Sequence, residues 1–322
     1  MEHSRISQKD SATIVAYGEV LWDLLPSGPV LGGAPLNFVY RINSLGYRGI
    51  MISQLGNDAF GDQAAEQMIA LGMEMDFIRR ISEYPTGTVE ITLDEQKNPD
   101  FTIIPNVAYD YIRHAPEMDE CTRNADCLYF GTVAQRSDVS RRTLEKLLDA
   151  FSGQYALFDI NLRKNCYTPE VIKSSLARST ILKLNDGEMP VVAQMYGIPG
   201  KSIQEFTDGL LRKIPLKYCL VTLGARGAFA ASNEGEKVYE PAYRVTLVDT
   251  CGSGDAFTAG FLYALLDNQG LRQACKFGNA LGAIVAEQHG ATQTVTYAEI
   301  EHFMQKRETI EVELQFKKYF RL

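Results

Sequence analysis

The feature that most constrains the fold is the alternation of short apolar runs with helical patterns along most of the chain. The apolar runs lie at 13–18, 50–54, 77–81, 126–131 and 155–160, and two more begin at 180 and 220. Helical patterns lie at 35–45, 61–71, 139–151, 254–266, 271–289 and 297–307. Continuous apolar runs are typical of strands buried on both faces, and parallel strands need long crossovers such as helices. The alternation therefore predicts an α/β fold with a doubly wound, mostly parallel sheet and helices on both faces.

One segment departs from this alternation and predicts a second, smaller sheet. Residues 87–93 and 100–104 alternate between apolar and polar side chains, and a polar turn at 94–99 separates them. This is a hairpin pattern. Because a two-stranded ribbon is marginal on its own, we expect it to pair with a strand from 21–31.

The composition excludes several classes of partner. The chain has 322 residues, 45% hydrophobic content and a net charge of -8, which fits one large domain with a smaller appendage. The acidic balance argues against nucleic acid or an anionic membrane as partner. The six cysteines are scattered and the four histidines are isolated, which favours reduced thiols over disulfides or zinc. The N-terminal residues are polar and no apolar run approaches a membrane span, so we expect a soluble cytoplasmic protein.

The turn most informative about function lies at 249–255, between an extended run at 243–248 and a helical pattern that starts at Gly254. Gly252 and Gly254 allow successive backbone N–H groups to converge at the positive end of a helix dipole, which suits a phosphate or developing negative charge. Asp255 would repel a resting phosphate there. Either it accepts a proton from a hydroxyl that attacks a phosphoryl group, or it caps the helix. This stretch alone favours the two interpretations about equally.

Residues near the N-terminus have both a functional and a structural interpretation. Gly32 and Gly33 precede a helix that has Pro35 in its first turn and Asn37 two residues further. The glycines could allow close approach of a polyol whose hydroxyls Asn37 binds, or they could simply form the turn that precedes the helix. The local pattern favours the second interpretation. Asp23 could accept hydrogen bonds from two sugar hydroxyls or be a solvated loop residue.

Other polar residues lie where ligands bind in doubly wound sheets. Gln135 and Arg163 follow two consecutive predicted strands. Arg163 could pair with a charged substrate or the transferring phosphate, or form a surface ion pair. Asn57 and Asp58 could face a sugar, although Asp58 could equally cap the helix at 61–71. Phe101 could cover the apolar face of a sugar, although an aromatic residue in a hairpin is more often ordinary sheet packing.

Asn185 and Glu188 lie where another predicted strand ends and a helix begins. Two oxygen ligands at the carboxyl end of one strand suit Mg²⁺, which keeps most of its waters and takes few protein ligands. The same spacing is also that of a capping box at a helix start. The strand that begins at 220 ends in a glycine-rich turn with Gly224 and Gly227.

Two motifs fail when their spacing is checked. Gly200-Lys201-Ser202 could end a phosphate-binding loop, but Met195 stands where that loop needs its first glycine. We expect a helix start capped by Ser202 instead. Phe257 stands where a dinucleotide-binding fingerprint would need its third glycine, which argues against hydride transfer.

Several stretches together resemble one enzyme family. Residues 249–255, Asp-Thr-Cys-Gly-Ser-Gly-Asp, resemble the second signature of the ribokinase (PfkB) family of sugar kinases, whose members usually carry Ala where this chain has Ser253. Gly32–Asn37, Asn185–Glu188 and Thr222–Gly227 resemble other family stretches in the same order, and the resemblance covers about residues 13–296. It implies an ATP-dependent sugar kinase with a ribokinase-like core and a small β-sheet lid, which excludes water from the transfer.

The resemblance also implies a role for individual residues. Asp255 would be the catalytic base, and the amides of Cys251, Gly252, Ser253 and Gly254 would form the anion hole. The sugar would contact Asp23, Gly32, Gly33, Asn37, Phe101, Gln135 and Arg163, and ATP would contact Asn185, Thr222, Gly224, Gly227 and Asn279. Asn185 and Glu188 would hold Mg²⁺ through water, and Asp249 would lie near an activating monovalent cation such as K⁺.

The resemblance further implies a division of the chain and a substrate. The core would comprise 13–20, 34–84 and 110–296, the lid 21–33 and 85–109, and a C-terminal helical extension 297–322. The stretches 18–23, 85–89 and 158–163 resemble those of fructokinases most, which implies D-fructose as substrate and fructose 6-phosphate as product. The alternatives are a 2-keto-3-deoxygluconate kinase that uses Arg163 for the substrate carboxylate, another sugar or nucleoside kinase of the family, and a non-catalytic sugar or nucleotide sensor. A homodimer through the lid, with the C-terminal tail adding interface, is a further expectation.

Overall fold

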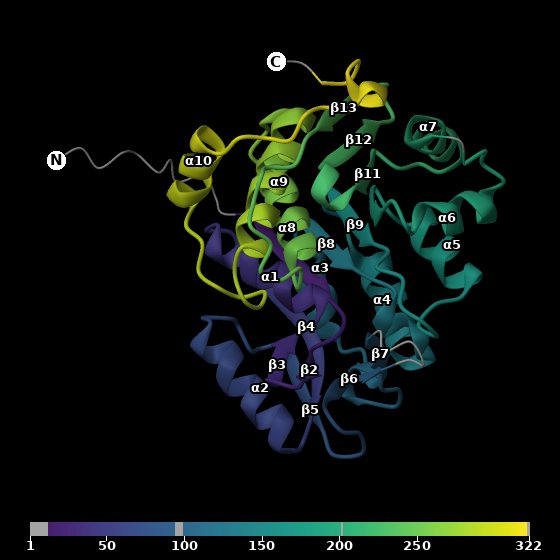
Figure 1. Cartoon of the computed structure of the whole chain (residues 1–322). Helices are drawn as coiled ribbons and strands as arrows, with labels where there is room; N and C mark the ends of the chain where they lie inside the picture. The colour runs from purple at the N-terminus through teal and green to yellow at the C-terminus, as the bar shows by residue number, and fades with distance from the viewer. Residues whose placement is uncertain (1–11, 94–98, 201, 321–322) are drawn as a thin grey trace.

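The computed structural model describes residues 12–93, 99–200 and 202–320, with the backbone alone for 91–93 and 99–101 (Figure 1). Within these residues a nine-stranded sheet runs in the order β13-β12-β11-β10-β9-β8-β1-β4-β5. Its strands are β1 (Thr13–Tyr17), β4 (Arg48–Gly56), β5 (Ile78–Ile81), β8 (Cys127–Phe130), β9 (Tyr155–Asp159), β10 (Ile181–Asn185), β11 (Tyr218–Thr222), β12 (Ala228–Ser232) and β13 (Lys237–Glu240). The strands from β5 to β11 are parallel and the last two pairings are antiparallel. The predicted fold class is confirmed.

Helices cover both faces of this sheet. Ile14 and Ala16 of β1 point into one apolar cluster and Val15 and Tyr17 into the other, because side chains alternate along a strand. The first cluster includes residues of α1 (Ala34–Ser44), α2 (Ala59–Ala70), α8 (Ser253–Leu266), α9 (Gly270–Ala286) and α10 (Tyr297–Lys306). The second includes residues of α3 (Pro116–Arg123), α4 (Asp138–Ala150), α5 (Pro169–Ala177), α6 (Met189–Tyr196) and α7 (Ile203–Lys213). Short 3₁₀ helices are η1 (Ala108–Tyr111), η2 (Val133–Arg136), η3 (Gly224–Arg226) and η4 (Leu314–Phe316).

The small second sheet forms as the hairpin pattern predicts. Its order is β3-β2-β6-β7, with β2 (Leu21–Leu25), β3 (Gly28–Gly32), β6 (Gly87–Leu93) and β7 (Pro99–Ile103). The ribbon β6–β7 is antiparallel, and β6 pairs in parallel with β2, the strand expected from 21–31. Figure 1 shows this sheet at one end of the molecule, beside β4 and β5.

The extended run at 243–248 is not a strand of either sheet, contrary to its pattern. Its one bridge pairs Tyr243 with Thr309. Its other backbone bonds go elsewhere: Arg244 N–H donates to the Glu308 carbonyl at 2.8 Å and Val248 N–H to the Ala286 carbonyl at 2.9 Å. The chain therefore approaches the 249–255 turn along the C-terminal end of α9, and not from the edge of a sheet.

The sequence pattern also left some elements out. It did not predict α3, α5 or the antiparallel edge of β12 and β13, whereas the helix expected to begin at 185–188 is α6. The start of α7 agrees with its prediction, since Ser202 Oγ accepts the Glu205 N–H at 3.1 Å.

The C-terminal tail packs on the core, far from the lid. Phe316 is 3% exposed, and the yellow segment that contains it lies at the end of the molecule opposite the lid (Figure 1). A homodimer through the lid, with the tail adding interface, stays a prediction. Among the described residues, no helix is long and apolar enough to cross a membrane.

Candidate active site at the start of helix α8

The turn that begins α8 needs glycine at its N-cap. Gly252 has a φ of +71°, and an added Cβ would lie 2.3 Å from the Ala291 Cβ. A left-handed backbone and this close approach both exclude larger residues. The helix start therefore lies directly against the loop that follows α9.

Two of the four amides predicted for the anion hole are used inside the turn. The Cys251 N–H donates to Asp249 Oδ1 at 2.9 Å, and the Ser253 N–H donates to the Thr250 carbonyl at 3.2 Å. The Ser253 hydroxyl also donates to that carbonyl, at 2.9 Å, which keeps it from pointing at a ligand. In the described part of the chain, the amides of Gly252 and Gly254 have no acceptor. These two N–H groups at the positive end of α8 are free to bind an anion.

Asp255 lies in the first turn of α8 and is held by a residue from α1. Asn37 Nδ2 donates to Asp255 Oδ2 at 2.8 Å. The N-cap of α8 is Gly252, and within the described residues no side chain caps the helix, so the capping interpretation of Asp255 is wrong. Asn37 is 4% exposed, and its Oδ1 has no hydrogen-bond partner among the described residues. Its amide therefore positions the carboxylate with one end and leaves an acceptor at the other.

The surroundings of Asp255 favour a carboxyl that exchanges protons near neutral pH. Burial, and after it the charge of Asp159, raise the pKa of Asp255 to about 6. The hydrogen bond from Asn37 and the charges of Lys183 and Arg163 lower this pKa and so limit the rise. A carboxyl with such a pKa suits a general base.

A buried ion pair lies behind this turn, and sequence analysis did not single it out. Lys183 Nζ contacts both oxygens of Asp159, at 3.1 and 3.0 Å, and the two residues pair across β10 and β9. Their side chains are 9% and 1% exposed. Tyr129 and Thr258 hydroxyls lie 3.3 and 3.4 Å from Asp159 Oδ2. A Cβ added to Gly254 would lie 3.5 Å from Lys183 Nζ, so the ammonium group stands next to the anion-binding turn.

Two acidic residues from the N-terminal part of the chain lie near this turn. Asp23, on β2, is partly exposed, and a Cβ at Gly32 would lie 3.0 Å from its Oδ2. Glu19 is 4% exposed, its Oε2 has no partner among the described residues, and burial raises the pKa of Glu19 to about 7. Gly33 has a φ of +119°, and a Cβ there would lie 2.4 Å from the Glu19 carbonyl oxygen. Both glycines thus allow close backbone approach, and Glu19 is a buried acid that the sequence pattern did not indicate.

Arg163 is the exposed cation near these acids. Burial raises the pKa of Asp23 and of Asp255, and the positive charge of Arg163 opposes that rise in both. Its guanidinium donates a long hydrogen bond, 3.3 Å, to the Leu162 carbonyl, and it has no ion pair within the described ranges. The guanidinium is therefore free to meet an anionic group.

Other residues expected at the sugar are occupied within the fold. Gln135 Nε2 donates to the Gly131 carbonyl at 2.7 Å, and its Oε1 accepts from Ser175 at 3.1 Å. Asp58 caps α2 through Gly61 N–H at 2.7 Å and binds both donors of Thr86. The Phe101 backbone pairs with Ile91 in the lid, but its side chain lies outside the described residues. Asn57 Nδ2 donates to Ser82 Oγ at 2.6 Å.

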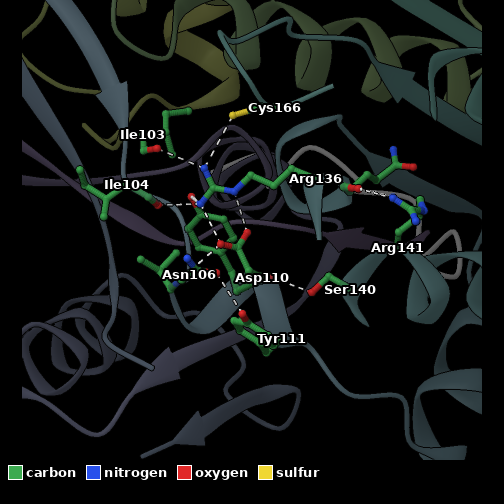
Figure 2. A network of polar contacts seen from close by, with 12 residues as sticks. Ile103, Ile104, Asn106, Asp110, Tyr111, Arg136, Ser140, Arg141 and Cys166 are labelled. Carbon is green, nitrogen blue, oxygen red and sulfur yellow. Dashed lines mark hydrogen bonds and ion pairs between the residues drawn. The ribbon is translucent and has the colours of Figure 1, made fainter. Parts of the chain in front are cut away.

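Arg136, next to Gln135, connects the end of the lid to the core by hydrogen bonds (Figure 2). Arg136 Nε and Nη2 donate to the two oxygens of Asp110 at 2.8 and 2.9 Å. The same guanidinium donates to the carbonyls of Ile103 and Ile104, at 3.2 and 2.7 Å, where β7 ends. Bidentate pairing of this kind fixes geometry as well as charge. Arg136 therefore holds the point where the chain leaves the lid.

The turn after β10 has the reciprocal bonds of a capping box. Glu188 Oε2 accepts the Asn185 N–H at 2.8 Å, and Asn185 Oδ1 accepts the Glu188 N–H at 2.9 Å. Glu188 Oε1 accepts the Leu162 N–H at 2.7 Å. Each oxygen already accepts one bond, which fits a metal held through water better than direct ligation. Within the described residues no three His, Cys, Asp or Glu side chains cluster as a metal site.

The residues expected at ATP divide into two groups. Thr222 ends β11 and is partly exposed, and Gly224 has a φ of +56° with open space around its Cβ position. Gly227 has a φ of +100°, and a Cβ there would lie 2.1 Å from the Glu240 carbonyl oxygen. Asn279 Nδ2 donates to the same carbonyl at 2.9 Å. Thr222 and Gly224 therefore face accessible space, whereas Gly227 and Asn279 pack against the Glu240 carbonyl on the inner side of the loop.

Comparison with known proteins decides the family. The model of the pfkB family carbohydrate kinases matches residues 29–297. The chain belongs to this family. It is 27% identical to a probable fructokinase-3 from Arabidopsis thaliana over 97% of both chains, and 26% identical to a fructokinase from Escherichia coli over 87% and 95%. The fructokinase of Xylella fastidiosa with bound ATP has the same fold, with a TM-score of 0.79 at 22% identity over 91% and 98% of the chains. The protein is therefore a pfkB-family sugar kinase.

The kinase should lose activity on the acid side as Asp255 becomes protonated. We expect an acid limb of kcat/KM with an apparent pKa near 6, because burial raises the pKa of Asp255 to about 6 and only the ionised carboxylate accepts a proton. Asn37→Ala removes a hydrogen bond that lowers the pKa of Asp255, so the acid limb of kcat/KM of this variant should move to higher pH. The exposed Asn124→Ala is the matched control. An unshifted limb in Asn37→Ala would contradict the assignment.

Proposed function

We propose that this sugar kinase is an ATP-dependent fructokinase that converts D-fructose to fructose 6-phosphate. The observation that carries the proposal is the carboxylate of Asp255 in the first turn of α8, next to the free amides of Gly252 and Gly254. The choice of fructose is supported by the similarity to fructokinases and by the fructokinase-like stretches at 18–23, 85–89 and 158–163. A structural neighbour from Vibrio cholerae, 23% identical with a TM-score of 0.78, is a fructokinase bound to fructose, ADP and potassium ion.

The proposed reaction is a direct transfer. Asp255 accepts the proton of the sugar hydroxyl while the hydroxyl oxygen forms a bond to the γ-phosphorus, and the bond from that phosphorus to the β,γ-bridging oxygen breaks, releasing ADP. The amides of Gly252 and Gly254 and the dipole of α8 stabilise the charge on the transferring group. Asn37 keeps the carboxylate aligned through its 2.8 Å bond. Asp23 accepts hydrogen bonds from the sugar hydroxyls at the lid side.

Two ions belong to this proposal. Asn185 and Glu188 would hold Mg²⁺ through water, and Mg²⁺ bound to ATP supplies neutralisation of the phosphate charge. Asp249 would lie near a K⁺ site, where its carboxylate orders the turn by accepting the Cys251 and Gly290 N–H groups at 2.9 and 3.1 Å. Comparing activity in potassium-free and potassium buffer tests the second ion.

A second candidate is a 2-keto-3-deoxygluconate kinase, favoured by one observation. Arg163 is exposed and in no ion pair within the described residues, yet its charge acts on Asp23 and Asp255. A substrate carboxylate would form an ion pair with this guanidinium. In that case Arg163→Gln should raise the KM for an acidic sugar and leave that for a neutral sugar almost unchanged.

A substrate panel distinguishes these functions. ADP release is measured with D-fructose, ribose, adenosine, 2-keto-3-deoxygluconate and other neutral and acidic sugars. We expect the highest kcat/KM with fructose. A preference for the acidic sugar would support the second candidate. Saturable binding of sugar and nucleotide without ADP release would overturn both and support a sensor.

A further inference from the structure

The C-terminal segment 307–320 lies beyond the matched family region and covers an edge of the large sheet. Phe316 stacks on Tyr239 of β13, with ring centroids 4.2 Å apart and an angle of 8° between the rings. Tyr319 meets Phe229 edge-on at 5.1 Å, and its carbonyl accepts the Tyr239 N–H at 3.3 Å. Edge strands need such cover, because their free backbone groups otherwise pair with other chains. Cover of the sheet edge alone does not require the contact that this segment makes with Arg226.

The covered strand is bonded to the loop expected to approach ATP. Tyr239 Oη donates to the Arg226 carbonyl at 2.6 Å, so the ring that stacks on Phe316 also fixes the backbone of this loop. The Arg226 guanidinium pairs with Asp186 and lies 3.6 Å from Glu313 of the tail. Asp186 directly follows Asn185. Arg226 thus joins the tail, the loop at 222–227 and the turn at 185–188.

The loop needs this external support. Gly224 has a left-handed backbone, and no atom of the described residues lies within 4 Å of its Cβ position, so side-chain packing does not hold that end. Glycine also has more conformational freedom to lose than any other residue. Amides that bind phosphate act well only when their neighbours hold them in place.

We propose that the segment 307–320 is a positioning element of the nucleotide site, which holds the 222–227 loop through Phe316 and Glu313. This inference rests on the proposed kinase function for its substrate, ATP. Phe316 should contribute more than Glu313, because Phe316 is 3% exposed whereas the Arg226–Glu313 pair is partly exposed and exposed pairs contribute little.

The test compares KM values for ATP and for the sugar in the full-length chain. Phe316→Ala should raise the KM for ATP by about fivefold or more, the equivalent of roughly 1 kcal/mol, with the KM for the sugar unchanged. Leu314→Ala is the matched control, because Leu314 belongs to the same short helix η4 but is 83% exposed. Phe316→Leu should recover most of the affinity. If Phe316→Ala does not fold, Glu313→Gln, which leaves the aromatic packing intact, should change the KM for ATP in the same direction by a smaller factor, with the exposed Glu311→Gln as control.

The two proposals fail in different ways. An unchanged KM for ATP in Phe316→Ala, or an equal rise in both KM values, would overturn the positioning role and leave the kinase function standing. A merely structural role would lower kcat through a smaller folded fraction and leave both KM values unchanged. If the native chain binds ADP without turning over any sugar, the kinase proposal fails, and the Kd for ADP from calorimetry replaces the KM in the same comparison.

Discussion

Replacing Asp255 by asparagine is expected to lower turnover about 10²- to 10⁴-fold, the usual contribution of a general base. The amide keeps the size of the side chain and can still accept the bond that Asn37 Nδ2 donates at 2.8 Å, but it cannot take the hydroxyl proton. The measurement is kcat for the best sugar of the panel. Asp76→Asn, the same change at an exposed position away from the site, should leave kcat unchanged.

The stability of Asp255→Asn distinguishes loss of chemistry from loss of fold. Burial raises the pKa of Asp255 to about 6, from 3.8 in an unfolded chain. Between these pH values the unfolded chain loses its proton first, so ionisation destabilises the native fold increasingly as pH rises. The asparagine variant has no such penalty and should unfold at a temperature equal to or above that of the native chain at pH 7. Near-normal turnover in this folded variant would remove Asp255 from the mechanism.

The fold was largely predictable because its determinants are local. Strands buried on both faces must be apolar along their length, so runs such as Thr13–Tyr17 indicate a covered parallel sheet. In the described part of β6, Val89 is buried and Glu90 is exposed, which is the alternation of a sheet with one face near water. The edge strand β13 has only four residues, and its neighbour β12 (Ala228–Ser232) is rich in alanine, so neither has a marked strand pattern.

The site was predictable only where one turn contains it. Gly252, Gly254 and Asp255 are neighbours in sequence, and their chemistry follows from their spacing. The bond between Asn37 and Asp255 joins residues 218 positions apart and depends on how α1 packs against α8. The pairing of Lys183 with Asp159 depends on the register of β10 against β9. Lys183 and Asp159 each place a charge within an apolar strand pattern. That interruption is a sequence signal that could have identified the pair.

Lys183→Met is expected to destabilise the protein by about 3–5 kcal/mol, because it leaves the carboxylate of Asp159 buried without its partner. The pair is buried, with side chains 9% and 1% exposed and contacts of 3.1 and 3.0 Å. Denaturant unfolding measures the loss. Lys237→Met is the matched control, because Lys237 pairs with Asp208 at 2.8 Å near the surface and such pairs contribute about 1 kcal/mol or less. The double variant Asp159→Asn with Lys183→Met should recover much of the stability, since no unpaired charge remains.

The same pair should also set the pH dependence of turnover. The charge of Asp159 raises the pKa of Asp255 and that of Lys183 lowers it. Lys183→Met should therefore move the acid limb of kcat/KM to higher pH, and Asp159→Asn should move it to lower pH, although both variants lose stability. A pair that only supports the fold would lower stability in both variants and leave the limb in place. Opposite shifts would therefore show that the two buried charges tune the base, because no shared loss of packing can move one pKa in two directions.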